Sequence, residues 1–216
     1  MSPRAKSASP RADSLARPSA ARRGGTPAKA SAPRILPLTK ERWADFEALF
    51  GPRGACGGCW CMWWRLKRAD WERGQGAGNK QAMKKLVAGG AVPGLIAYIG
   101  EEPVGWASLG PRESYSVLGR SPVLKPVDDV PVWSLVCFFI RKEHRRRGLS
   151  GALIAAAKKH AKAGGARWLE AYPTEPKTAE MPDIYAFTGV PAMFTAAGFK
   201  EIARRSPTRP ILRCKL

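Results

Sequence analysis

The spacing of apolar and polar positions divides most of the chain into strands and helices. Continuous or alternating apolar runs predict strands at residues 34–38, 94–99, 104–109, 132–140, 167–172, 199–204 and 210–215. Apolar positions three and four apart predict helices at 40–50, 149–163 and 191–197, with two shorter helices between 69 and 87. Thr39 is the expected N-cap of the first helix, and the polar residues 111–129 read as a long loop. This order predicts an α/β layer fold with a mixed sheet.

Residues 1–33 do not share this pattern. They consist mainly of Ala, Ser, Pro, Arg and Gly, and Asp13 is their one acidic residue. Such a segment buries too little apolar surface to offset its ordering entropy, so we expect a disordered basic tail followed by one domain, residues 34–216. The tail is rich in Arg and Ser, as organelle import segments are, but it has no amphipathic period. We therefore expect a cytoplasmic protein, with organelle import as the alternative.

Net charge narrows the choice of partners. The chain carries +20, and the tail supplies +6 of it, seven basic residues less one acidic, which leaves +14 on the domain. Such a charge suits either a nucleic acid or a polyanionic cofactor. Nucleic acid is the less favoured partner, because the sequence has no recognition-helix pattern, zinc finger or RNA-binding aromatic motif. Five cysteines and no apolar run long enough for a membrane span favour reduced thiols in a cytosol-like compartment.

A basic turn lies between the 132–140 strand and the 149–163 helix. Its sequence, residues 145–151, is Arg-Arg-Arg-Gly-Leu-Ser-Gly. Free N–H groups at a helix start attract anions, and Gly148 and Gly151 allow a ligand to approach the main chain. The glycine spacing is neither that of a Walker loop nor that of a dinucleotide fingerprint. The turn therefore indicates phosphate binding without naming the phosphate.

Three segments resemble the GNAT superfamily of acyl-CoA-dependent N-acyltransferases. Arg145-x-x-Gly148-x-Ser150 is similar to its cofactor motif, Gln/Arg-x-x-Gly-x-Gly/Ala, with Ser as a departure in the last position. Residues 138–144 resemble the fourth strand and its exit, and residues 191–199 resemble the helix ending in Gly-Phe before the sixth strand. The resemblance covers residues 34–216. It implies an α/β fold with a mixed, mostly antiparallel sheet of six or seven strands and helices on both faces.

The same resemblance implies an N-acetyltransferase that uses acetyl-CoA and transfers the acetyl group directly to an amine. The residues expected to bind the cofactor are Cys137, Phe138, Phe139, Ile140, Arg145, Arg146, Arg147, Gly148, Leu149, Ser150 and Gly151. The acceptor stays open among a small-molecule amine, a polyamine and a protein N-terminus or lysine, and a homodimer is also left open. Two alternatives are a CoA-binding regulatory module without catalysis and a basic nucleic-acid-associated protein.

The segment 56–64, Cys-Gly-Gly-Cys-Trp-Cys-Met-Trp-Trp, admits three interpretations. Its thiols suit a soft metal, but zinc motifs usually contain two separated cysteine pairs, so we expect no metal. Its apolar side chains suit a core. In the resembled family this region lines the acceptor pocket, which assigns substrate contacts to Trp60, Trp63 and Trp64. Tyr185 is a further expected substrate contact.

The usual proton donor of the GNAT superfamily has no counterpart in this sequence. It is often a Tyr four residues before the Gly of Gly-Phe, and that position is Phe194, which has no hydroxyl. Expected replacements are Tyr172 and Glu170 on the fifth strand, with Tyr185, Asp183 and Cys137 as further candidates. Glu170 suits a salt bridge equally well, and Tyr172 suits the edge of a core.

Overall fold

The computed structural model of the protein describes residues 32–176 and 183–216. In these residues seven strands form one sheet in the order β1-β2-β3-β4-β5-β7-β6. All neighbouring pairs are antiparallel except β4 and β5, which are parallel. The strands are β1 (Arg34–Pro37), β2 (Gly94–Ile99), β3 (Glu102–Pro111), β4 (Trp133–Ile140), β5 (Trp168–Ala171), β6 (Lys200–Arg204) and β7 (Pro210–Lys215). The predicted mixed, mostly antiparallel sheet is confirmed.

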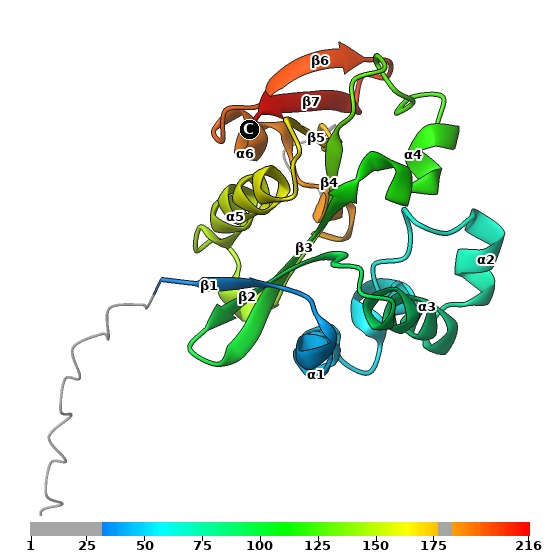
Figure 1. Cartoon of the computed structure of the whole chain (residues 1–216), viewed down its shortest axis with the longest axis vertical. Helices are drawn as coiled ribbons and strands as arrows, with labels where there is room; N and C mark the ends of the chain where they lie inside the picture. Colours follow the sequence, from blue (N-terminus) through cyan, green and yellow to red (C-terminus); the bar gives the residue numbers. More distant parts are fainter. Residues whose placement is uncertain (1–31, 177–182) are drawn as a thin grey trace, which may run out of the picture. The chain divides into compact units, whose positions relative to one another are not determined.

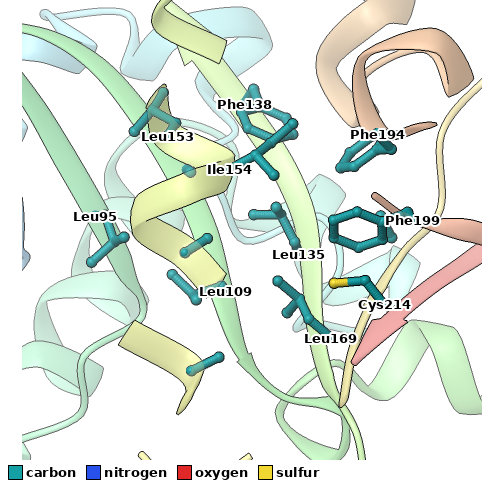
Figure 2. Close-up of a cluster of buried hydrophobic side chains, with 14 of the residues drawn as sticks. Leu95, Leu109, Leu135, Phe138, Leu153, Ile154, Leu169, Phe194, Phe199 and Cys214 are labelled. Carbon is teal, nitrogen blue, oxygen red and sulfur yellow. The ribbon is translucent and has the colours of Figure 1, made fainter. Parts of the chain in front are cut away.

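Helices cover both faces of this sheet, as Figure 1 shows. They are α1 (Trp43–Phe50), α2 (Arg68–Arg73), α3 (Ala77–Ala88), α4 (Ser116–Arg120), α5 (Leu149–Ala163) and α6 (Pro191–Thr195). Alternation along β2 explains the two faces, because Leu95 and Ala97 pack in the cluster of α5 while Ile96 and Tyr98 pack with α1 and α3. Figure 2 shows the first cluster, in which Phe138 of β4 and Phe194 of α6 point toward one another. Their ring centroids are 6.0 Å apart.

Two local expectations need correction. Thr39 occupies the predicted N-cap position, but its hydroxyl accepts a hydrogen bond from Arg42 Nη1 at 3.2 Å and makes no side-chain bond to the helix N–H groups. The segment 111–129 is not a plain loop, because it contains a 3-10 turn (Arg112–Ser114) and α4. Leu118 is the one buried residue of α4, and a single buried apolar residue in so short a helix gives no periodic signal. The disorder expected for residues 1–33 is not tested, because residues 1–31 lie outside the described part of the chain.

No helix in the described residues is both long enough and apolar enough to cross a membrane.

Candidate active site

The site begins where β4 and β5 separate. The two parallel strands pair over three residues of each, from Trp133 with Leu169 to Leu135 with Ala171. Beyond this point β4 continues to Ile140 and pairs with β3 alone. A register shift between β3 and β4 leaves Val136 as an extra residue, which re-aims the following side chains. The free edge of β4 therefore presents peptide groups that have no sheet partner on that side.

A cavity of about 400 Å³ lies at this separation. Its walls come from the end of β4, the start of α5, the start of α6, the turn after α1 and the 3-10 helix Asp183–Thr188 with Gly189. The lining residues are Ala55, Cys56, Phe138, Phe139, Ile140, Arg145, Ser150, Ala186, Phe187, Gly189 and Met193. Most of this lining is apolar, and Arg145 and Ser150 bring polar groups to one end.

That polar end is the N-terminus of α5. Gly148 is the N-cap at φ 76°, a left-handed conformation that favours glycine. A Cβ built on Gly148 or Gly151 would meet no atom within 4 Å, so space lies open in front of both. Arg145 Nε donates to the carbonyl of Ile140 at 3.0 Å, which ties the basic turn to the end of β4. The N–H groups of this first helical turn and the positive end of the helix dipole suit a phosphate.

The structure brings together most of the residues expected to bind the cofactor. Phe138, Phe139, Ile140, Arg145 and Ser150 line the cavity. Arg146, Arg147, Gly148 and Gly151 lie exposed around the helix start, whereas Leu149 is buried in the core and leaves only its main chain for a ligand. Cys137 is half-buried and packs on the face of the sheet opposite α5.

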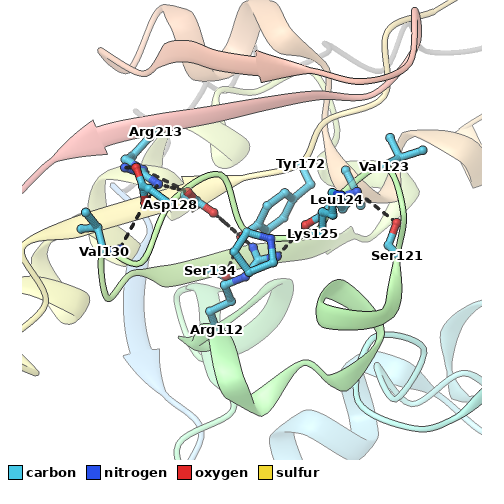
Figure 3. Close-up of polar contacts among 12 residues, drawn as sticks. Arg112, Ser121, Val123, Leu124, Lys125, Asp128, Val130, Ser134, Tyr172 and Arg213 are labelled. Atoms are coloured by element: carbon cyan, nitrogen blue, oxygen red, sulfur yellow. Dashed lines mark hydrogen bonds and ion pairs between the residues drawn. The ribbon is translucent and has the colours of Figure 1, made fainter.

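Tyr172 and Glu170, the expected catalytic pair, lie in a buried polar network. Figure 3 shows Tyr172 in this network with Ser134, Arg112 and Arg213. Tyr172 Oη donates to Glu170 Oε2 at 2.7 Å and lies 2.8 Å from the hydroxyl of Ser134. Arg112 Nη1 donates to Glu170 at 3.2 Å, and Arg213 Nη2 donates to it at 2.7 Å. Burial first, and then the Glu170 carboxylate, raise the pKa of Tyr172 well above its usual value. This geometry links three strands, β4, β5 and β7, to the 3-10 turn at Arg112, and it favours a structural role for both side chains.

Replacing Tyr172 with phenylalanine tests this interpretation of the network. The change removes one donor from Glu170 and one partner from Ser134, so the free energy of unfolding should fall by about 1–3 kcal/mol. The kcat of a folded variant should stay within a few-fold of wild type, because the hydroxyl is already bonded and fully buried. Urea unfolding measures the first quantity, and kinetics of the reaction proposed below measure the second. A kcat lower by about a hundredfold with unchanged stability would instead support a catalytic acid.

The three tryptophans of segment 56–64 lie in different places. Trp60 is 3% exposed and stacks on Phe50 with ring centroids 5.8 Å apart, so it belongs to the core. Trp63 is half-buried, edge-on to Trp71. Trp64 is 6% exposed, and its ring lies 6.3 Å from Phe187 of the cavity wall. The side chain of Tyr185 lies outside the described part of the chain.

The turn before Trp60 has unusual backbone geometry. Ala55, Trp60 and Cys61 all have positive φ, at 63°, 45° and 60°, which costs a non-glycine residue about 1–2 kcal/mol. A Cβ on Gly54 would lie 2.2 Å from Nε1 of Trp60, so glycine is required there.

The five cysteines are free thiols, and no group of three or more metal-binding side chains converges among residues 32–176 and 183–216.

The Cys61 thiol lies next to several polar groups. Its Sγ accepts a hydrogen bond from Trp106 Nε1 at 3.2 Å. The hydrogen bond from the Cys137 thiol has the largest effect on Cys61, and those from Trp106 and Ser108 and the charge of Arg65 act in the same direction. Together they outweigh burial and lower the pKa of Cys61 to about 7. A thiolate at this position would face Cys137 of β4.

We expect the ultraviolet absorbance of a thiolate to appear as the pH rises through about 7, and to vanish in Cys61→Ser. The folded protein lowers the pKa of this thiol from 9 to about 7. Ionisation of Cys61 therefore contributes fully to the free energy of unfolding above pH 9, and this contribution is lost as the pH falls through about 7. Cys214→Ser is the matched control, because burial raises the pKa of Cys214 to about 11. Loss of the absorbance step in Cys214→Ser would contradict this assignment.

Several residues near the site gave no signal in the sequence. Phe187 and Gly189 line the cavity from a segment that has no helical or strand period, and Met193 reaches it from the start of α6. Arg112 lies 58 residues before its partner Glu170. Contacts of this kind depend on the tertiary fold, so a single sequence cannot reveal them.

Comparison with known proteins adds family evidence to this geometry. A sequence model of the Acetyltransferase (GNAT) family matches residues 60–181, more than half of the chain. The match includes β4, the basic turn and α5. A search of curated proteins gives no match.

Solved structures with a similar fold are numerous but distant in sequence. A PaiA N-acetyltransferase from Thermoplasma acidophilum in complex with coenzyme A is 13% identical, with a TM-score of 0.50 over 86% of this chain and 100% of that chain. An N-acetyltransferase from Staphylococcus aureus is also 13% identical, with a TM-score of 0.51 over 86% and 99%. A GNAT-family acetyltransferase from Listeria monocytogenes is 8% identical, with a TM-score of 0.53 over 85% and 95%. At these identities the likeness concerns the fold.

Proposed function

Because this chain belongs to the acetyltransferase (GNAT) family, we propose that it transfers an acetyl group from acetyl-CoA directly to an amine. The observation that carries the proposal is the cavity beside the free edge of β4, which ends at the N-terminus of α5. One end of this cavity suits phosphate and its walls suit an apolar arm.

The residues present fit acetyl-CoA. The N–H groups of residues 148–151 would hold the pyrophosphate, because no side-chain atom fills the space in front of Gly148 and Gly151. The free edge of β4 would hydrogen-bond the amides of the pantetheine arm, and Phe138, Ile140 and Met193 would contact its apolar parts. Acetyl-CoA would supply a thioester whose carbonyl carbon accepts the amine.

The chain contributes charge and position to the transfer. The domain carries +14, and a positive environment disfavours an ammonium ion, so it helps the acceptor amine to lose its proton before attack. The dipole of α5 and the basic turn would stabilise the pyrophosphate, and N–H groups on the free edge of β4 would stabilise negative charge that develops at the thioester during transfer. Phe194 is fully buried in the core and provides no proton, so the proton reaches the thiolate by another path.

The same phenylalanine favours one alternative, a CoA-binding regulatory module without catalysis. Such a module would bind CoA as tightly as an enzyme does and release no thiol in the presence of amines. Nucleic-acid association is a third proposal and rests on the net charge of +20 alone.

A thiol-release assay with acetyl-CoA and a broad amine panel, combined with calorimetry of CoA binding, separates these functions. We expect CoA binding and amine-dependent thiol release. Binding without release for any amine would favour the regulatory module. Absence of binding would contradict both CoA-dependent functions.

A further inference from the structure

Arg209 lies beside the cavity, immediately before β7. Arg209 Nη1 donates to Thr174 Oγ1 at 2.5 Å and to Thr188 Oγ1 at 3.4 Å. Thr188 lies between Phe187 and Gly189, two residues of the cavity wall. The N–H of Thr174 donates to the carbonyl of Gly189 at 3.0 Å, which joins the end of β5 to the same wall. Through Thr188, the guanidinium contacts the segment that carries two of the lining residues.

The positive charge of Arg209 has no carboxylate partner in the described part of the chain. In contrast, Arg112 and Arg213 share Glu170, and Arg204 pairs with Glu201 and Glu175. Arg209 is half-buried, and burial lowers the pKa of its guanidinium. A desolvated cation without a counter-ion costs free energy, which a bound anion would offset.

Trp64 provides an unsatisfied hydrogen-bond donor close to Arg209. Trp64 is only 6% exposed, and its Nε1–H has no acceptor within the described residues. The Arg209 guanidinium carbon lies 5.9 Å from the centroid of the Trp64 ring, and that ring lies 6.3 Å from Phe187. A buried indole N–H normally finds an acceptor, so this donor is available to a bound acceptor group.

We propose that Arg209, assisted by the Trp64 indole N–H, binds a carboxylate on the acceptor, so that the acetyl acceptor is an amino acid or a similar small amino carboxylate. The inference rests on the proposed acetyl transfer and specifies its substrate class. One guanidinium neutralises one carboxylate and matches its planar fork, whereas a phosphomonoester carries nearly two charges. The two threonine hydroxyls and the Trp64 ring around Arg209 add no further positive charge to the subsite.

Matched acceptor pairs test the proposal. Each pair consists of an amino acid and the amine that its decarboxylation gives: ornithine with putrescine, phenylalanine with phenethylamine, and alanine with ethylamine. We expect the acid to have the higher kcat/KM in at least one pair. Arg209→Gln should raise the KM for that acid at least about thirtyfold with kcat and CoA affinity retained, and Arg209→Lys should restore part of the loss.

Arg205→Gln is the control, because Arg205 is exposed and donates to the carbonyls of Lys125 and Pro126. It should keep the preference for the acid. The melting temperature of Arg209→Gln should equal or exceed that of wild type, since the variant removes an unpaired charge. A lower melting temperature together with equal losses for acid and amine would show that Arg209 supports the fold, and would overturn the proposal.

Failure of the proposed function gives a different pattern. If CoA binds but none of the acids or amines causes thiol release, their binding to the CoA complex is measured instead, by titration of the tryptophan fluorescence. Saturable binding of an acid that disappears in Arg209→Gln supports the subsite, and absence of acid binding overturns it. A preference for the amine in every pair overturns it as well.

Discussion

Replacing Glu170 with glutamine is expected to lower the free energy of unfolding by about 3–5 kcal/mol. Glu170 is 2% exposed and neutralises both Arg112 and Arg213, whose side chains are each 10% exposed. Glutamine keeps the shape but leaves two desolvated guanidinium groups with less negative charge between them. The loss corresponds to a melting temperature lower by roughly 6–20 °C for a domain of this size. Differential scanning calorimetry measures it.

Glu201→Gln is the matched control for this change. Glu201 also pairs with an arginine, Arg204, but its side chain is 41% exposed, so water screens the interaction. Its melting temperature should stay close to that of wild type. Equal melting temperatures for the Glu170 and Glu201 variants would contradict the structural role of the buried network.

Replacing Gly151 with glutamate is expected to weaken CoA binding by about tenfold or more, equal to at least about 1.4 kcal/mol, without harming the fold. Gly151 lies in the first turn of α5, where a Cβ meets no atom within 4 Å. A glutamate there suits the helix dipole, so α5 should stay folded or gain stability. The new carboxylate occupies the space in which the pyrophosphate would be held, and repels it. Calorimetric titration with CoA measures the affinity.

Gly78→Glu provides the same substitution at a distant helix start. Gly78 lies in the first turn of α3, is exposed, and also has open space at its Cβ position. CoA affinity should therefore be unchanged in this variant. A similar loss of affinity in both variants would mean that net charge, and not the α5 turn, governs binding.

The elements of the fold were predictable because their signals are local. The alternation of Leu95, Ile96, Ala97 and Tyr98 assigns successive side chains to opposite faces, and the structure places them so. The basic turn at 145–151 likewise combines glycines, arginines and a helix start in seven consecutive residues. Short helices such as α4 were missed because one buried leucine is too weak a signal.

The site was predictable only where one segment builds it. Phe138 to Ile140 and Ser150 were expected at the cofactor and line the cavity. Trp60 and Trp64 lie four residues apart with the same chemistry, yet one is core and the other lies beside the cavity wall. The role of Glu170 depends on Arg112 and Arg213, 58 and 43 residues away in the chain. Sequence spacing alone carries no information on such partners.

A crystal structure of the protein with coenzyme A tests the central claim most directly. We expect the pantetheine arm between β4 and β5, against Phe138 and Ile140, and the pyrophosphate within hydrogen-bond distance of the N–H groups at residues 148–151. Coenzyme A bound at another surface, or with its pyrophosphate away from the start of α5, would contradict the account.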